Sequence, residues 1–312
     1  LLMGAGDWND SFTGVGAKGK GESVWLSQFA VMVLESFGQM LKSVGKDSAF
    51  YFETAAALRT AVETYAWEGD RYLRAYYDDG EKMGSPQSAE CKIDSLTQSF
   101  SVFADLSPER RTTALQTAYR ELVDTENGVV RLFSPAFSGE NKKAGYVAAY
   151  PAGIRENGGQ YTHAAVWFCR ALFRNGEKDA GETVLHLLNP LEKYQNKALC
   201  EKYLTEPYYL AGDVYAAKGA EGRGGWSLYS GSAGHFYALV AEELLGIQKR
   251  DGAYTFSPNP PESWGNFRFR LHLAGAEIQV EVPKLRKGGM EIDKKPAERF
   301  TPDGKDHVIQ LL

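Results

Sequence analysis

The hydrophobic period of the chain changes once, near Gly246, and this change constrains the fold more than any other feature. Before Gly246, apolar side chains recur every three or four residues, as they do along one face of an α-helix. After it, residues 267–273 and 277–282 alternate apolar with polar side chains, as half-buried strands do. The chain is therefore expected to be mainly α-helical, with a small antiparallel β domain at its end.

The helical part predicts helices joined by long glycine-rich loops. Ser107, Pro108 and Glu109 have the order of an N-cap, a first-turn proline and a first-turn acid, which predicts where one helix begins. The predicted helices span residues 22–44, 51–65, 93–103, 108–122, 162–174, 178–188, 207–217 and 232–245, with a weaker pattern over 191–203. The glycine-rich loops occupy residues 11–21, 78–89, 129–159 and 218–231. Loops of this kind on a helical scaffold usually carry binding and catalytic residues.

Composition excludes several classes of function. A formal net charge of −5 and a pI near 5.7 argue against binding along the phosphates of a nucleic acid. No apolar run approaches the roughly 20 residues that span a bilayer, so no membrane partner is expected. Three cysteines give no disulfide framework, and the five histidines are scattered without zinc-ligand spacing. The sequence therefore predicts a reduced, cytoplasmic protein without a metal site.

The loop at residues 4–10 places Trp8 and an amide between two carboxylates, Asp7 and Asp10. Its glycines let the backbone approach a ligand closely, and an indole packs on the apolar face of a sugar ring while keeping water away. A carboxylic acid beside such a ring can donate a proton to a glycosidic oxygen. An N-cap aspartate and a core tryptophan explain the same residues equally well.

A second loop ends where a helix is predicted to begin. Arg155 and His163 are suited to hold an anion, and Glu156, Gln160 and Tyr161 are suited to bind hydroxyl groups. His163 follows two glycines at the predicted helix start, where backbone N–H groups already favour anions. A histidine with a purely structural hydrogen bond is the alternative.

A third loop, residues 222–234, is rich in glycine and serine and opens a predicted helix, which makes it a candidate cradle for phosphate. No Gly-Lys-Ser/Thr follows, so a nucleotide-binding P-loop is not supported, and a tight turn is the competing interpretation. Glu206 is a candidate to face a substrate from a further helix start, and Asp94 and Gln98 share one helix face elsewhere. For these last two segments a structural role is favoured.

Together these segments resemble glycoside hydrolase family 94, the inverting phosphorylases that include cellobiose and chitobiose phosphorylases. The matching stretches follow the family's order over about the first 250 residues: Gly6–Asp10, Gly153–Ala164, Glu206–Tyr208 with Asp213–Tyr215, and Gly222–Trp226 with Ser230–Gly234. Three further stretches are most similar to the branch of β-1,2-oligoglucan phosphorylases and the phosphorylase-like domain of cyclic β-1,2-glucan synthases: Gly21–Leu26, Gly84–Pro86 with Ile93–Ser95, and Leu188–Pro190.

The resemblance implies a fold and a set of site residues. Residues 1–248 would form part of an (α/α)6 barrel, and residues 249–312 a small antiparallel β-sandwich domain. Asp10 would be the general acid, with Trp8 lining the sugar subsite beside it. The phosphate-binding residues would be His163, Ser230 and Gly231. The family usually has threonine where Ser230 stands, and relatives often carry tryptophan at the position of His235.

The resemblance also implies a reaction. Inorganic phosphate, as co-substrate and without another cofactor, would cleave a β-glucoside with inversion and give α-glucose 1-phosphate. A β-1,2-linked gluco-oligosaccharide is the favoured substrate, and a cellobiose-type substrate is retained. One alternative is an inverting hydrolase on the same barrel with Glu156 or Asp7 as base. Another is a non-catalytic carbohydrate-binding fragment.

The family places further barrel helices, a β domain and a phosphate-contacting arginine ahead of the segment that matches Gly6–Asp10. Only about eight or nine helices are predicted here, fewer than the twelve of an (α/α)6 barrel. The chain is therefore expected to be the C-terminal portion of a longer or split polypeptide. Its expected protein partners are an N-terminal part of the same enzyme or a second copy in a homodimer.

Overall fold

The computed structural model describes residues 1–312 except 141, 207 and 229, and the side chain of Ser230 also lies outside the described part. The chain divides into two compact units, Leu1–His235 and Phe236–Leu312. The first unit is mainly helical, and the second contains a β-sheet. A mainly helical chain with a β-rich end is therefore confirmed.

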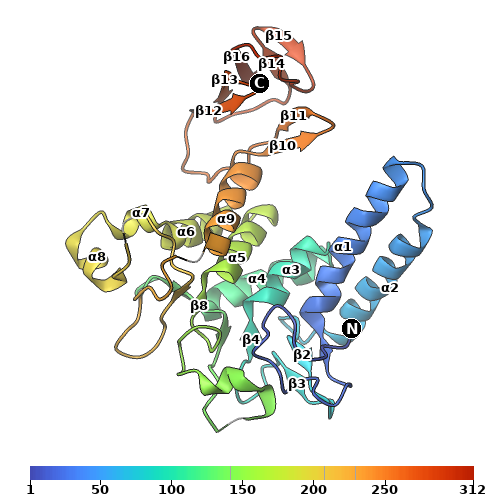
Figure 1. Ribbon diagram of the computed structural model, residues 1–312, viewed down its shortest axis with the longest axis vertical. Coiled ribbons are helices and arrows are strands. Elements are labelled where there is room, and N and C mark those ends of the chain that lie inside the picture. The colour runs from blue at the N-terminus through green and yellow to red at the C-terminus, as the bar shows by residue number, and fades with distance from the viewer. Residues whose placement is uncertain (141, 207, 229) are drawn as a thin grey trace. The chain divides into compact units, whose positions relative to one another are not determined.

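The first unit is built from helices that pack on the next helix in the chain or on the one after it (Figure 1). α1 packs on α2 and α3, α3 also packs on α4 and α5, and α5 packs on α6. The helices are α1 (Val24–Ser43), α2 (Ala49–Tyr65), α3 (Ser95–Phe103), α4 (Pro108–Leu122), α5 (Thr162–Arg174), α6 (Lys178–Leu188), α7 (Pro190–Lys193), α8 (Lys197–Tyr203) and α9 (Ser230–Ala238). Lys142–Ala144 and Tyr146–Ala149 form short 3-10 turns.

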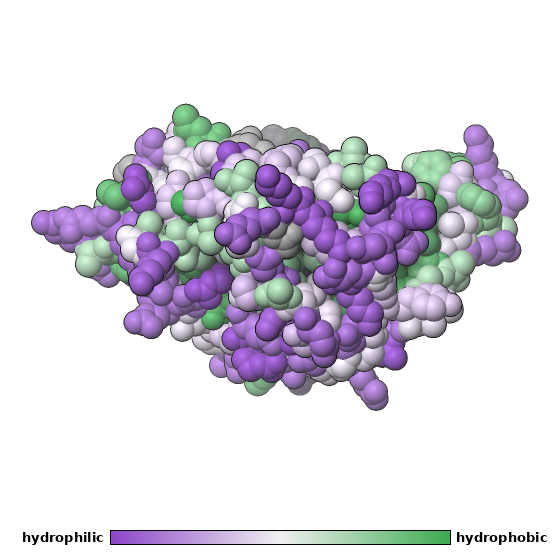
Figure 2. All heavy atoms as spheres, turned by 90° about the horizontal axis from the view of Figure 1, so that it is seen from below, coloured by the Kyte–Doolittle hydropathy of each residue, from purple (hydrophilic) through white to green (hydrophobic). Residues whose placement is uncertain are grey.

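Short strands directly precede three of these helices and tie their N-termini to distant loops. The strands are β1 (Glu22–Ser23), β2 (Ala75–Tyr76), β3 (Lys82–Met83), β4 (Ile93–Asp94), β5 (Val123–Asp124), β6 (Val129–Val130), β7 (Phe133–Ser134), β8 (Gln160–Tyr161) and β9 (Asp213–Val214). β1 pairs with β2 before α1, β4 with β7 before α3, and β8 with β9 before α5. The pairings gather the long loops at one end of the helices, where β2, β3, β4 and β8 lie low in Figure 1. Seen from below, this face is largely hydrophilic, with smaller apolar groups between (Figure 2).

Two apolar clusters support the loop end and the helices. Phe12, Leu96 and Phe133 belong to the buried cluster beneath the loops. Val31 and Val62 belong to a second buried cluster that α1 and α2 share with the segment before β2. The loop at residues 4–10 therefore rests on a packed core.

The second unit departs from the antiparallel β-sandwich that was expected. Its strands are β10 (Ile247–Arg250), β11 (Ala253–Phe256), β12 (Phe267–Leu273), β13 (Ala276–Val282), β14 (Met290–Ile292), β15 (Lys295–Ala297) and β16 (His307–Leu311). β10 and β11 form a hairpin, and the others form one sheet in the order β12-β13-β16-β14-β15. β13 and β16 run parallel, so the sheet is mixed. The turns separating the strands did not reveal that β16 joins the middle of the sheet.

Helix α1 has apolar side chains on its exposed face as well as on its buried face. No apolar run long enough to cross a membrane was expected from the sequence. Among the described residues, α1 alone has the length and composition that could cross a membrane. This is weak support for a membrane span, because core helices of soluble proteins pass the same test. Here α1 packs against α2 and α3.

Candidate active site

Asp7 and Asp10 lie in one loop but in opposite environments. The Asp7 side chain is fully buried, and both of its oxygens accept hydrogen bonds from Arg74 at 2.7 and 2.8 Å. Burial alone would raise the pKa of Asp7, but the charge and hydrogen bonds of Arg74 bring it below its ordinary value. Asp7 therefore has no access to water or substrate, which argues against it as the base of a hydrolase.

Asp10 is exposed at the surface of the same loop. Its Oδ1 accepts a hydrogen bond from the Tyr146 hydroxyl at 3.0 Å. Partial burial, together with the hydrogen bond to Asp10 and its negative charge, raises the pKa of Tyr146 to about 12. Tyr146 thus remains a hydrogen-bond donor to this carboxylate across the physiological range. Its position in a glycine-rich loop gave no signal of this contact in the sequence.

Trp8 joins this loop to His163 in the first turn of α5. The indole Nε1 of Trp8 donates to Nδ1 of His163 at 3.3 Å, and Trp167 packs on the same imidazole with ring centroids 4.0 Å apart. Nε2 of His163 is buried without a hydrogen-bond partner among the described residues. Burial, and then the nearby His235, lower the pKa of His163 to about 4. The imidazole is therefore neutral near pH 7, with one ring nitrogen still to be satisfied.

His235 stacks on His163 with ring centroids 4.1 Å apart. It lies in α9, whose first turn contains Gly231. A Cβ atom at Gly231 would meet nothing within 4 Å, so the space beside this backbone is open. The predicted contact of Ser230 with phosphate falls on a side chain outside the described residues.

Arg155 and Glu156 form a partly satisfied pair. Arg155 has a left-handed backbone with φ of 52°, and its guanidinium lies 4.0 Å from the ring centroid of Trp226 and 4.6 Å from that of Tyr150. Burial raises the pKa of Glu156, and the nearby charges of Asp10 and Asp213 add to this effect. In the described part, Nε of Arg155 and Oε2 of Glu156 are buried without hydrogen-bond partners. These two atoms lie 3.7 Å apart as an ion pair, which is too long for a hydrogen bond, so the pair is a candidate to bind polar ligand atoms.

Three further predicted residues lie in different environments: Tyr161, Gln160 and Glu206. Tyr161 packs edge-on against Trp8 with ring centroids 5.0 Å apart, which places it beside the candidate sugar surface. Gln160 is buried, its amide oxygen accepts from the Val130 N–H, and its amide nitrogen donates to Thr162, which disfavours a role in binding hydroxyl groups. Glu206 is exposed, and a hydrogen bond from Ser227 lowers its pKa.

The site is thus a series of aromatic rings between an acid and a histidine. Ring or cation contacts link Trp8, Tyr161, Trp226, Arg155, Tyr150 and Tyr146, and Tyr146 returns to Asp10. Apolar ring faces combined with sparse polar groups suit a sugar. Among the described residues, no group of three or more His, Cys, Asp or Glu side chains could hold a metal ion.

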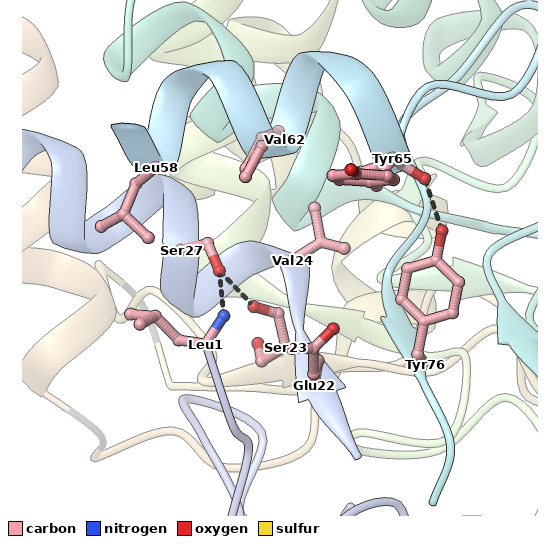
Figure 3. Close-up of a pocket in the computed structure, with 11 residues that line it drawn as sticks. Leu1, Glu22, Ser23, Val24, Ser27, Leu58, Val62, Tyr65 and Tyr76 are labelled. Atoms are coloured by element: carbon pink, nitrogen blue, oxygen red, sulfur yellow. Dashed lines mark hydrogen bonds between the residues drawn. The ribbon is translucent and has the colours of Figure 1, made fainter. Parts of the chain in front are cut away.

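A cavity lies elsewhere, between α1, α2 and the first residues of the chain (Figure 3). It has a volume of about 500 Å³ and is lined mainly by apolar side chains, including Leu1, Val24, Leu58 and Val62. Ser27 accepts a hydrogen bond there from the amino group of Leu1 at 2.7 Å. Its titratable lining residues are Glu22, Tyr65 and Tyr76. The described residues that line this cavity include no histidine or arginine, so the loop site remains the candidate active site.

Comparison with known proteins gives matches over nearly the whole chain. Residues 1–246 match the catalytic domain of the glycosyl hydrolase 94 superfamily, and residues 247–301 match the C-terminal domain of glycosyl hydrolase family 65. The cyclic beta-(1,2)-glucan synthase NdvB of Rhizobium meliloti is 38% identical over 93% of this chain and 10% of its own length. The N,N'-diacetylchitobiose phosphorylase of Vibrio proteolyticus is 30% identical over 89% of this chain and 34% of its own length.

The family predicted from the motifs is confirmed by these matches. The chain spans between 10% and 40% of the length of the first curated relatives that it matches. A solved glycosidase variant in complex with glucose has a similar fold, with a TM-score of 0.50 and 16% identity over 76% of this chain and 54% of that one. At this identity, the likeness concerns the fold alone.

Proposed function

The chain belongs to the glycosyl hydrolase 94 superfamily, and from this premise we propose that it catalyses inverting phosphorolysis of a β-glucoside. The observation that carries the proposal is the hydrogen bond from the Trp8 indole to the His163 imidazole. It joins the loop of a candidate acid to an imidazole whose second nitrogen has no protein partner in the described part. A phosphorylase needs an anion site where an inverting hydrolase needs a second carboxylate to activate water.

Asp10 is assigned as the general acid. It gives its proton to the glycosidic oxygen while the bond from that oxygen to the anomeric carbon breaks. A phosphate oxygen attacks the anomeric carbon from the opposite face, held by His163 and the backbone at Gly231. The proton that phosphate loses on forming the ester balances the one that Asp10 gave up. The products are α-glucose 1-phosphate and an acceptor shortened by one residue.

The nature of the substrate is supported by two relatives. The chitobiose phosphorylase supports phosphorolysis as the reaction type, and the cyclic β-1,2-glucan synthase supports a β-1,2-linked gluco-oligosaccharide as substrate. Arg155 and Glu156 would bind hydroxyl groups of such a sugar, and Trp8 and Tyr161 would pack on its ring. The helical unit is proposed to be part of an (α/α)6 barrel. Phosphate is the proposed co-substrate, without a further cofactor.

Phosphate titration with a β-1,2-gluco-oligosaccharide tests the proposal in the longest natural polypeptide that contains this chain. Release of glucose 1-phosphate should rise with phosphate and saturate. Asp10→Asn should lower kcat by about 10²–10⁴-fold, the usual contribution of a positioned acid. Asp105→Asn is the matched control, because Asp105 is exposed, pairs with Arg111 and has a left-handed backbone that asparagine tolerates.

Two results would contradict phosphorolysis. Sugar release that requires Asp10 but does not depend on phosphate would favour the hydrolase, with Glu156 as its base because Oε2 of Glu156 lacks a hydrogen-bond partner in the described part. Glucan binding that survives in Asp10→Asn, without turnover in the unchanged protein, would favour a non-catalytic carbohydrate-binding role.

A further inference from the structure

Arg74 is a fully buried arginine that contacts the loop at residues 4–10, called the acid loop below because it contains Asp10. Its side chain is fully buried between two carboxylates that are also fully buried, Asp7 and Asp94. Its two terminal nitrogens bind Asp7 at 2.7 and 2.8 Å, and its Nε binds Asp94 at 3.1 Å. A guanidinium bound in this bidentate way is fixed in orientation as well as in position.

Three elements meet at this guanidinium. Ser23, the N-cap of α1, donates its hydroxyl to Asp7 at 2.6 Å. Asp94, the N-cap of α3, accepts from the backbone N–H of Leu96 at 2.8 Å. Arg74 itself lies in the segment just before β2, and a Cβ atom at Gly84 would come within 2.4 Å of its backbone nitrogen. The starts of two helices are therefore held against the acid loop through one side chain.

The loop passes this placement on to Asp10 through its backbone. Oδ1 of Asp7 accepts the N–H of Asn9 at 2.8 Å, and the buried Asn9 in turn accepts from the N–H and hydroxyl of Ser11. Asp10 stands between these two fixed residues. Its own side chain is exposed and hydrogen-bonds the exposed Tyr146. The position of the Asp10 carboxyl thus depends on the backbone that Asp7 and Asn9 hold.

We propose that Arg74 is a positioning residue for the general acid, fixing the Asp7–Asn9 turn so that the Asp10 carboxyl meets the leaving oxygen. This rests on the proposed function, because it assigns Arg74 to the protonation step of that reaction. Displacing a catalytic group by about 1 Å can lower the rate by about 100-fold. Arg74 touches neither sugar nor phosphate in this scheme, so its loss should act on kcat and leave phosphate binding intact.

The leaving group separates a misplaced acid from general damage. A gluco-oligosaccharide leaves as an alkoxide and needs a proton, whereas 2,4-dinitrophenolate leaves from 2,4-dinitrophenyl β-glucoside without one. A variant with a misplaced acid should therefore be slow on the first substrate and nearly normal on the second. A variant with a damaged fold should be slow on both.

The experiment compares Arg74→Lys and Asp7→Asn with Arg71→Lys. Arg71 is the matched control, because it is also buried and pairs with Asp70 and Glu121 at 2.7 and 2.8 Å, away from the acid loop. With the oligosaccharide, both test variants should lose about 100-fold in kcat with the phosphate KM within about twofold. With the dinitrophenyl glucoside the loss should fall below about fivefold, and Arg71→Lys should change neither. Equal losses on both substrates, or full activity in Arg74→Lys, would overturn the proposal.

Hydrogen exchange of the loop supplies a readout that does not depend on turnover. The amide of Asn9 should exchange about tenfold faster in Arg74→Lys and in Asp7→Asn, and at the normal rate in Arg71→Lys. Asp7→Asn keeps the shape of the side chain and remains informative if Arg74→Lys does not fold. An unchanged protein that releases no glucose 1-phosphate from either substrate would refute the proposed function. Unchanged exchange at Asn9 would then refute the positioning role separately.

Discussion

At the scale of single residues, the hydrogen bond from Trp8 fixes the proton on His163. An indole nitrogen can only donate, so Nδ1 of His163 must accept and the proton of the neutral ring must sit on Nε2. Burial lowers the pKa of this imidazole to about 4, so the ring stays neutral at any pH well above 4. His163 thus presents a neutral N–H donor, rather than a cation, to the proposed phosphate.

Removing the indole N–H should weaken phosphate binding. Trp8→Phe keeps an aromatic face for the sugar but loses the bond to Nδ1, so His163 is free to change tautomer. We expect the phosphate KM to rise about 5–10-fold, equivalent to about 1 kcal/mol, the usual value of one hydrogen bond. Trp167→Phe, which removes an indole that packs on the same ring, is the control and should leave the KM within about twofold. A larger rise of the phosphate KM in Trp167→Phe than in Trp8→Phe would contradict the role of Trp8.

The pH dependence of the phosphate KM follows from the lowered pKa of His163. Between pH 5 and 8 the phosphate KM should show no step that depends on His163, because the ring gains its proton only near pH 4. A profile measured beside that of His163→Gln checks this. A step near pH 6.5 in the unchanged protein that disappears in the variant would show a histidine with an ordinary pKa.

Sequence reasoning could propose candidate residues that stand in local motifs, but it could not predict contacts between residues far apart in the chain. Asp10, Trp8 and His163 were recognisable because a motif surrounds each of them. Arg74 and Tyr146 were not, because their partners lie 67 and 136 residues away in the chain. For Gln160 the motif gave no sign of the hydrogen bonds that its amide makes to Val130 and Thr162.

At the scale of elements, the start of α3 depends on a carboxylate in an unusual environment. Asp94 caps the helix and shares Arg74 with Asp7, so two carboxylates meet one cation. Burial raises the pKa of Asp94 to about 6, although the charge of Arg74 opposes this. In an unfolded chain the same group would ionise near pH 4. Folding therefore favours the protonated form of Asp94.

The raised pKa predicts that the free energy of unfolding of the unchanged protein and that of Asp94→Asn differ by an amount that depends on pH. The asparagine retains a capping oxygen and cannot ionise. Between about pH 4 and 6 the unfolded chain loses the Asp94 proton first. The free energy of unfolding of the unchanged protein should therefore fall, relative to that of the variant, as pH rises through this window. Above about pH 6 the difference should stay constant.

Denaturant unfolding at several pH values measures this difference. Asp94→Ala is the companion variant and should be less stable than Asp94→Asn by about 1 kcal/mol at every pH, because alanine cannot cap α3. A difference between the unchanged protein and Asp94→Asn that does not vary with pH would show that Asp94 is ionised throughout.

Helical periodicity predicted the bounds of three helices of the first unit well. α4, α5 and α6 begin and end within a residue of the predicted ranges 108–122, 162–174 and 178–188. The helix predicted over 207–217 is wrong for the described residues 208–217, which contain no helix: Asp213–Val214 form the short strand β9, which pairs with β8, and Tyr208 has a left-handed backbone. A strand of two residues leaves no period in a sequence, so only its partner reveals it.

Helix α1 shows a subtler limit of the same reasoning. Its apolar repeat correctly predicted a helix, but several side chains of that repeat are exposed: Phe29, Val33, Phe37, Met40 and Val44. The face that packs instead includes Val31 and Gly38, and a Cβ atom at Gly38 would lie 3.0 Å from the ring of Phe52. Close helix packing at a glycine carries no hydrophobic signal, so the sequence could not identify this face.

At the scale of the whole molecule, the described part of the chain contains a candidate acid, a candidate anion site and a second carboxylate near the acid, Glu156. Asp7 is buried against Arg74, which leaves Glu156 as the acidic side chain whose charge environment includes Asp10. A retaining enzyme would need a carboxylate nucleophile about 5 Å from its acid, on the opposite side of the anomeric carbon. The proposed hydroxyl-binding role of Glu156 and a neutral His163 suit direct attack by phosphate instead.

The stereochemistry of the product therefore tests the site as a whole. Direct attack by phosphate inverts the anomeric carbon once, so a β-glucoside should give only α-glucose 1-phosphate. Proton NMR of the reaction as it proceeds distinguishes the anomers by their coupling constants and detects the first product before any exchange. Glu156→Gln should weaken sugar binding yet still give the α anomer, because Glu156 forms no bond to the sugar in this scheme. An initial β anomer that disappears in Glu156→Gln would instead make Glu156 a nucleophile and the mechanism a double displacement.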